Sequence, residues 1–179
     1  MPRERLVQGL LQVYTGDGKG KTTCALGLGL RVIGQGFRVF MVQFLKGRDT
    51  GEALIAAQRL APDFTLRHFG RGALVNLRAP APEDLALVRE AWDLARQVLK
   101  AGEHDLVILD EINLALAFNL ISLEEGLEAL RRRPPWVEVV LTGRQAPPEI
   151  IELADLVTEM RPLKHYFAAG VPARRGIEW

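Results

Sequence analysis

Residues 14–23, YTGDGKGKTT, combine the residue types that bind phosphate groups. The glycines at 16, 18 and 20 allow a tight backbone path that turns peptide N–H groups inward. A helix that starts directly after them adds its positive end. Lys21 supplies a mobile positive charge, and the Thr22 hydroxyl is placed to bind Mg²⁺. The stretch predicts a nucleotide site, with a merely structural turn as the alternative.

The spacing inside this loop is unusual. Three residues separate Gly16 from Gly20, whereas the common phosphate-loop pattern G-x-x-x-x-G-K-[ST] has four. The position of the usual first glycine therefore falls at Thr15. We expect the start of the loop to differ from that of kinases and GTPases, and the triphosphate to be held differently.

Two adjacent carboxylates, Asp110 and Glu111, follow the apolar run LVIL. Oxygen ligands at the end of a strand suit a Mg²⁺ ion bound to phosphates. We predict that Glu111 binds the metal directly and that Asp110 lies next to the metal ligands without binding the metal itself. A strand that ends in Asp-Glu is also common for structural reasons, so the prediction depends on the loop upstream.

Short apolar runs must position these groups. Six of them read as strands, at residues 10–15, 37–45, 64–69, 105–110, 136–143 and 155–160. Helical patterns lie between several of them, which favours an α/β fold with a mostly parallel sheet and helices on both faces. Ligands of such sheets bind at the carboxyl ends of the strands. Residues 16–22, 43–46, 110–111 and 142–144 all fall at these ends.

The clearest helical pattern spans residues 83–100. Its apolar side chains recur at spacings of three and four, which predicts one buried face composed of Leu85, Val88, Trp92, Ala95 and Leu99. A second helix is expected within residues 122–133.

Composition limits the function classes. Lys and Arg number 23 against 22 Asp and Glu, so no overall field attracts nucleic acid or an anionic membrane. The single cysteine, Cys24, rules out an internal disulfide and is expected to be a small buried residue. We found no apolar run long enough for a signal peptide or membrane span, so we expect a cytoplasmic protein with one domain over residues 1–179.

Several segments together resemble the ATP:corrinoid adenosyltransferases. The resemblance covers nearly the whole chain and rests on TGDGKGKTT, RVIGQG, MVQFLKG, VILDEIN, VLTGR and the tail LADLVTEMRPLKHYFAAGVPARRGIEW. The most specific part is the pattern R-P-x-K-H-x-F-x-x-G-V at residues 161–171.

The resemblance implies a phosphate-loop NTPase-like (RecA-like) core and a homodimer. It implies transfer of the 5′-deoxyadenosyl group of ATP to the Co(I) of a reduced corrinoid, with release of triphosphate and with Mg²⁺ or Mn²⁺ as the metal. A flavoprotein is expected as the reductant of the corrinoid. The nucleotide is expected to lie in the loop in an unusual direction, which would explain the shortened spacing.

The family's functional residues carry over at matching positions. The ATP loop corresponds to Gly16, Asp17, Gly18, Lys19, Gly20, Lys21, Thr22 and Thr23. The metal residues Thr22, Glu111 and Asp110 are those already predicted from the residue types. Arg31 is a candidate nucleotide contact or a solvated helix residue. Arg144 and Arg161 are candidate partners of phosphate or of a corrin side chain, or else members of structural ion pairs. Lys164 and His165 belong to the tail motif, and His165 is not assigned to cobalt.

One segment departs from the family pattern. Some members carry aromatic residues in a G-F-T-W-like segment that is thought to help displace the lower cobalt ligand, whereas this chain has Gly72-Ala73-Leu74-Val75 there. Two rival functions stay open at this point. A kinase or ATPase would release ADP or phosphate, and a nucleotide-binding regulatory or corrinoid-carrier module would show little turnover.

Overall fold

A computed structural model describes residues 4–47, 50–72 and 75–178 of the chain. Its centre is a six-stranded sheet of the order β3-β2-β4-β5-β1-β6, in which all neighbouring strands are parallel. The strands are β1 (Leu11–Thr15), β2 (Val39–Phe44), β3 (Phe64–Phe69), β4 (Leu106–Asp110), β5 (Glu138–Thr142) and β6 (Leu156–Glu159). Each lies within its expected range, and the predicted fold class is confirmed.

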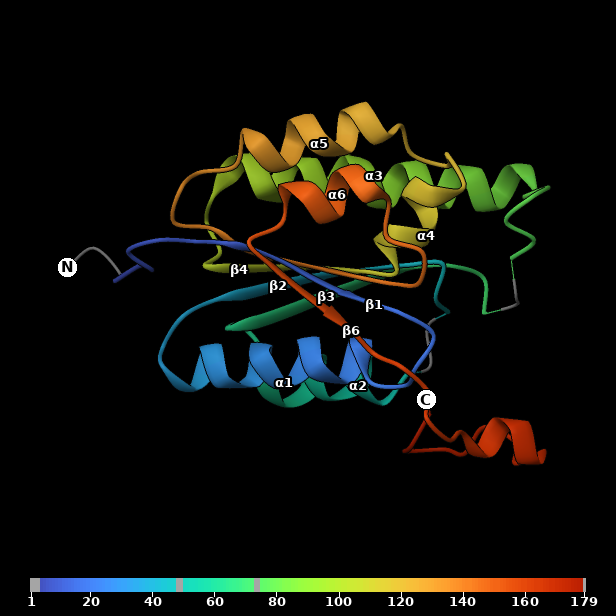
Figure 1. Cartoon of the computed structure of the whole chain (residues 1–179). Coiled ribbons are helices and arrows are strands. Elements are labelled where there is room, and N and C mark those ends of the chain that lie inside the picture. Colours follow the sequence, from blue (N-terminus) through green and yellow to red (C-terminus); the bar gives the residue numbers. More distant parts are fainter. Residues whose placement is uncertain (1–3, 48–49, 73–74, 179) are drawn as a thin grey trace.

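Helices cover both faces of the sheet (Figure 1). On one face lie α1 (Lys21–Gly34) and α2 (Gly51–Ile55), which continues into η1 (Ala56–Leu60). On the other lie α3 (Pro82–Ala101), α4 (Ile112–Ala117), α5 (Leu123–Arg131) and α6 (Pro148–Leu153). Parallel strands need such crossovers, and the helices bury the apolar residues of both sheet faces.

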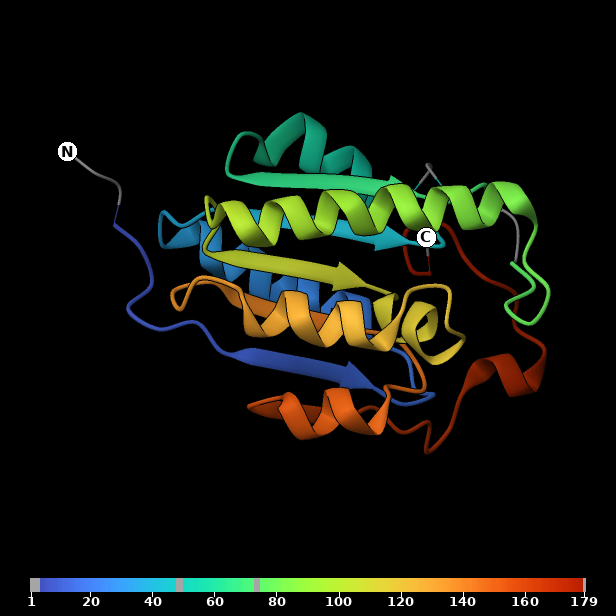
Figure 2. The same ribbon diagram turned by 90° about the horizontal axis from the view of Figure 1, so that it is seen from above.

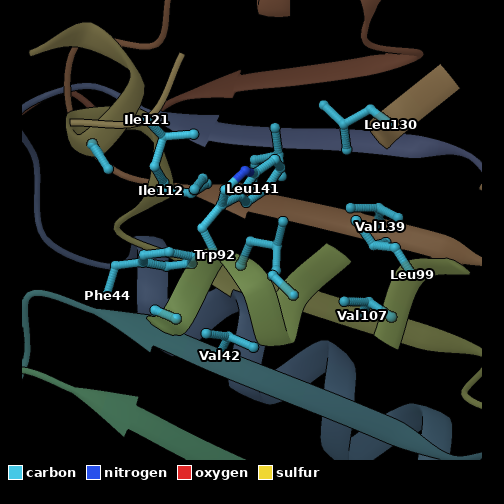
Figure 3. Close-up of a cluster of buried hydrophobic side chains, with 14 of the residues drawn as sticks. Val42, Phe44, Trp92, Leu99, Val107, Ile112, Ile121, Leu130, Val139 and Leu141 are labelled. Carbon is cyan, nitrogen blue, oxygen red and sulfur yellow. The ribbon is translucent and has the colours of Figure 1, made fainter. Parts of the chain in front are cut away.

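The larger part of the core lies between the sheet and α3 (Figure 3). Trp92 of α3 is 1% exposed and packs in one cluster with Phe44 and Leu141. Burial of a large apolar side chain contributes roughly 1.5–3 kcal/mol. Four of the five residues expected on the buried face of this helix are buried, but Leu85 is 42% exposed. It lies in the first turn of α3, and the periodicity alone did not indicate where contact with the sheet begins.

The opposite face of the sheet packs closely against α1. A Cβ atom added at Gly29 would lie 2.5 Å from Cε2 of Phe64, so this glycine permits the close approach of the helix to β3. The expectation that Cys24 is buried was wrong, because its position on α1 leaves it exposed. A buried alanine, Ala25, takes the adjacent position that faces the sheet.

The carboxyl ends of the strands meet at one edge of the sheet, and the C-terminal tail runs along this edge (Figure 2). The tail, residues 160–178, follows β6 and contains the short helix η2 (Tyr166–Ala169). Among the described residues, no helix has the length and apolar character needed to cross a membrane.

Candidate active site

The phosphate loop joins β1 to α1 and borders a cavity of about 610 Å³. Gly16 and Gly20 have φ values of 91° and 125°, a region that favours glycine. Gly20 is the N-cap of α1, no side chain caps the helix, and its first turn has no acidic residue. The N–H groups of this turn are therefore available to an anion. Of the predicted residues, Asp17, Gly18, Lys19, Gly20, Lys21, Thr22, Thr23, Glu111 and Arg144 line the cavity.

The tail holds the loop from behind. Gly18 donates its N–H to the carbonyl of Met160 at 2.7 Å. A Cβ atom at Gly16 would lie 2.5 Å from the same carbonyl oxygen, which explains the glycine there. Gly16 itself does not line the cavity, so its role is to let the loop pass close to the tail.

The side chain of Lys21 contacts the backbone of the phosphate loop. Its Nζ donates to the carbonyl oxygens of Gly16 at 2.7 Å and Gly18 at 2.8 Å. Burial lowers the pKa of Lys21 below its ordinary value, although the carboxylate of Glu111 opposes this. The ammonium group is thus held at the wall of the cavity, with carbonyl contacts that a phosphate oxygen can replace.

Asp110 is fully buried and lies behind the loop. Its Oδ1 accepts from the hydroxyls of Thr22 at 2.8 Å and Thr142 at 2.6 Å. Its Oδ2 accepts from Nε2 of Gln43 at 3.1 Å and Nζ of Lys46 at 2.7 Å. Asp110 does not line the cavity, and it positions the Thr22 hydroxyl that does.

Glu111 lies in front of Asp110 and does line the cavity. Its backbone has a φ of 64°, and its N–H donates to Oγ1 of Thr142 at 3.0 Å. Because of this turn between β4 and α4, the Glu111 carboxylate lines the cavity, whereas the Asp110 carboxylate is buried. Burial raises the pKa of Glu111 above its usual range, and the neighbouring charge of Asp110 adds to this effect.

Lys46 follows the end of β2, and its position there predicted no particular role for it. Its Nζ lies 3.0 Å from Oγ1 of Thr22, besides the contact with Asp110. Burial disfavours its charge, but the charge of Asp110 and its hydrogen bond outweigh this and raise the pKa of Lys46. Its ammonium group therefore joins the loop to the end of β4.

The three candidate arginines have different surroundings. Arg144 lines the cavity and forms a 3.6 Å ion pair with Asp17, which also lines it. Arg161 does not line it and instead pairs with Glu159 at 2.7 Å, in line with the structural alternative. Arg31 is exposed in the last turn of α1 and does not line the cavity, so the structure does not bring it to the loop.

The end of the tail forms another wall. Gly176, Ile177 and Glu178 line the cavity, as does His165. Lys19 ties this segment to the loop, since its Nζ donates to the carbonyl of Ile177 at 2.9 Å and pairs with Glu178 at 3.4 Å. The motif of residues 161–171 indicated a tail typical of the family, but it did not indicate that the tail contacts the phosphate loop.

A second cavity of about 520 Å³ adjoins the first. Lys46, Glu111 and Arg144 border both. The other lining residues are mostly apolar or glycine: Leu45, Gly47, Gly72, Val75, Leu77 and Leu114. Gly72 and Val75 belong to the segment that departs from the family pattern, while Ala73 and Leu74 fall outside the described residues.

Comparison with known proteins identifies the family. The family model described as ATP:corrinoid adenosyltransferase BtuR/CobO/CobP matches residues 7–179. The chain belongs to this family. A corrinoid adenosyltransferase of Escherichia coli K12 is 39% identical over 96% of this chain and 86% of its own length. The corresponding values for a family member of Pseudomonas aeruginosa are 39%, 96% and 84%, and for the corrinoid adenosyltransferase CobA of Salmonella typhimurium 37%, 96% and 86%.

A solved structure supports the predicted core at the level of the fold. The flagellar accessory protein FlaH from Methanocaldococcus jannaschii superposes with a TM-score of 0.51 over 85% of this chain and 71% of its own. With 14% sequence identity, this likeness concerns the fold alone, a RecA-like phosphate-loop core. Family membership therefore carries the functional argument, and none of these comparisons favours a kinase or ATPase.

Proposed function

We propose that this protein transfers the 5′-deoxyadenosyl group of ATP to the Co(I) of a reduced corrinoid and releases triphosphate. The single observation that carries the proposal is the family match over residues 7–179. The geometry agrees with it, because a phosphate loop faces one cavity and a mostly apolar cavity adjoins it.

The reaction needs alignment and charge stabilisation more than proton transfer. Co(I) is a strong nucleophile and donates an electron pair to C5′ of ATP. The C5′–O bond breaks, its electrons leave with the triphosphate, and cobalt becomes formally Co(III). No general base is required, so Glu111 activates no water in this account. The protein must place C5′ against the cobalt and neutralise the departing triphosphate.

The loop supplies the groups for the second task. The N–H groups at the start of α1 and the ammonium of Lys21 face the cavity and would bind the phosphate oxygens. Asp17, Lys19 and Thr23 line the same cavity from the loop, and Arg144 lines it from the segment after β5. We assign these residues to the nucleotide, with the polyphosphate next to Lys21.

The side chains of Thr22, Asp110 and Glu111 fit a Mg²⁺ ion. They offer hydroxyl and carboxylate oxygens, which this ion prefers, and Mn²⁺ accepts the same ligands. Among the described residues no group of three His, Cys, Asp or Glu side chains is arranged to hold a metal, so phosphate oxygens would have to complete the site. The metal would supply positive charge to the leaving triphosphate. Thr22 and Glu111 would hold it, and Asp110 would orient Thr22.

The second cavity is our candidate for the corrinoid. Its lining by Leu45, Val75, Leu77 and Leu114 suits one face of a corrin ring. Since Glu111 and Arg144 border both cavities, a corrinoid here would lie beside the nucleotide. The segment at residues 72–75 lacks aromatic side chains, so we assign no aromatic wedge against the lower cobalt ligand to it.

Four further assignments complete the proposal. We propose one adenosyltransferase domain over residues 1–179 and a homodimer, for which the exposed Leu163 and Phe167 of the tail offer apolar surface. Sedimentation as a monomer at micromolar concentration would contradict the dimer. A separate donor, for which we propose a flavoprotein, must supply the electrons that make Co(I). The need for ATP and a strong reductant favours the cytoplasm.

An anaerobic assay tests the proposal. The protein is mixed with ATP, Mg²⁺ and chemically reduced cobalamin, and the visible spectrum is followed. We expect loss of the Co(I) bands and appearance of the light-sensitive spectrum of an adenosyl–cobalt bond. Tight corrinoid binding without ATP consumption would instead indicate a carrier module.

A further inference from the structure

Lys46 lies between Thr22, a proposed metal ligand, and Asp110, which orients the Thr22 hydroxyl. Its Nζ lies 2.7 Å from Oδ2 of Asp110 and 3.0 Å from Oγ1 of Thr22. A positive charge that bridges a carboxylate and a threonine hydroxyl at the end of a phosphate loop has the surroundings expected for a divalent cation.

The carboxylate of Asp110 has no acceptor position to spare. An ionised carboxylate has about four lone-pair sites. All four are used, by the hydroxyls of Thr22 and Thr142 at Oδ1 and by Gln43 and Lys46 at Oδ2. A metal or its bound water can reach Asp110 only if one of these donors leaves.

Lys46 is the donor best able to leave. Gln43 and Thr142 are fully buried, whereas the side chain of Lys46 is 25% exposed and sits on a long flexible stem. It also borders both cavities, so its ammonium group can turn away from Asp110 without entering the apolar core. An ammonium group and a divalent cation cannot share the position, because like charges at this distance repel strongly.

We propose that Lys46 is a positioning residue that occupies the cation position before nucleotide binds and so keeps free divalent metal out. The polyphosphate of ATP then brings its own metal and enough negative charge to displace Lys46. Metal and nucleotide therefore enter together, and Thr22 and Asp110 stay in place until they do. The inference rests on the proposed metal residues but not on adenosyl transfer.

The test measures metal binding without corrinoid or turnover. Mn²⁺ is titrated into the protein, and the free ion is quantified by electron paramagnetic resonance. Wild type should bind Mn²⁺ only when ATP is present. Lys46→Met should bind Mn²⁺ without nucleotide at least about tenfold more tightly than wild type, since an uncompensated carboxylate then faces the position. Lys46→Arg, which keeps the charge, should exclude the metal like wild type.

Several controls keep the result decisive. Lys100→Met, at the exposed end of α3, should leave the Mn²⁺ titration unchanged. Adding Asp110→Asn to Lys46→Met should remove the gained binding. Lys46→Gln replaces Lys46→Met if circular dichroism shows that Lys46→Met does not fold.

The proposal is overturned if the neutral variant binds Mn²⁺ no better than wild type, or if the gain survives loss of the Asp110 charge. It is also overturned if nucleotide-free wild type binds the metal as tightly as it does with ATP. Because no corrinoid is used, any of these results can occur while transfer activity is intact.

Discussion

Gly18 of the phosphate loop donates its backbone N–H to the carbonyl of Met160 in the tail, at 2.7 Å. One donor of the loop is thus committed to the protein itself. The loop is shaped from both sides, by the helix that follows it and by the segment that follows β6. The tail is therefore part of the proposed nucleotide site although it lies at the far end of the sequence.

The contact predicts that Gly18→Ala disturbs the loop. An added Cβ atom would lie 2.7 Å from the oxygen of Met160, and backbone on both sides cannot easily move. We expect a loss of about 1–3 kcal/mol in stability, as for overpacking elsewhere, and weaker binding of ATP. Calorimetry of ATP binding and thermal unfolding check both. The matched control is Gly27→Ala in α1, where an added Cβ meets nothing within 4 Å. Equal behaviour of the two variants would refute the packing argument.

Lys21→Ala should slow the transfer step. The ammonium group is held at the cavity by the carbonyls of Gly16 and Gly18, where it can neutralise the leaving triphosphate. Loss of a preorganised donor costs about 10²–10³-fold in rate. Single-turnover adenosylation measures it, with Lys100→Ala as the control. An unchanged rate would break the assignment of the loop.

Glu111→Gln should stabilise the nucleotide-free protein in a pH-dependent way. Burial and the charge of Asp110 raise the pKa of Glu111. Ionised Glu111 therefore costs stability, and the cost grows as pH rises from its ordinary pKa of about 4.3 through the raised value. The variant should melt above wild type near about pH 7, by roughly 2–4 °C for each kcal/mol relieved, and like wild type near about pH 4. A difference that is the same at both pH values would show that ionisation is not the cause.

The same variant should depend differently on metal and on corrinoid. Because Glu111 is the proposed metal ligand, Glu111→Gln should raise the Mg²⁺ concentration needed for half-maximal rate more than the KM for corrinoid. Steady-state titrations of each measure this. Equal effects on both would argue against its metal role.

Glu178 should stabilise the folded path of the tail. Its carboxylate accepts from Tyr166 and from the N–H of Arg174 at 2.7 Å, and the hydrogen bonds from Arg174 and Tyr166 lower its pKa to about 2. Its contribution is present above the ordinary Glu pKa and is lost as pH falls toward about 2. Glu178→Gln should accelerate amide hydrogen exchange in residues 166–178 at neutral pH. Glu152→Gln, on the exposed side of α6, is the control. Identical exchange in both variants would contradict the role.

The sequence predicted the parts of the site that are local in the chain. The loop, the strand ends and the order of Asp110 and Glu111 follow from short patterns, and the structure brings them together. Lys46 received no role because its contacts with Thr22 and Asp110 depend on the order of the strands, in which β2 neighbours β4. The wall formed by residues 176–178 depends on the path of the tail, which no periodicity describes.

The places of Arg31 and Cys24 have simple physical reasons. Arg31 follows Lys21 on one helix, and a rise of about 1.5 Å per residue carries it about 15 Å from the loop. Cys24 is apolar by type, but the face of α1 on which it lies is set by the packing of Gly29 and Ala25 on the sheet. Composition gives a residue's preference, and the contact face decides its burial.

The central claim is that the bond from C5′ to the triphosphate breaks, and the phosphate product tests it most directly. Wild-type protein is incubated anaerobically with ATP, Mg²⁺ and Co(I) cobalamin, and the products are separated by anion-exchange chromatography. Adenosyl transfer predicts one triphosphate for each adenosylcobalamin formed. ADP or orthophosphate without a cobalt–carbon bond would contradict the account and leave a phosphate-loop enzyme that acts by phosphoryl transfer.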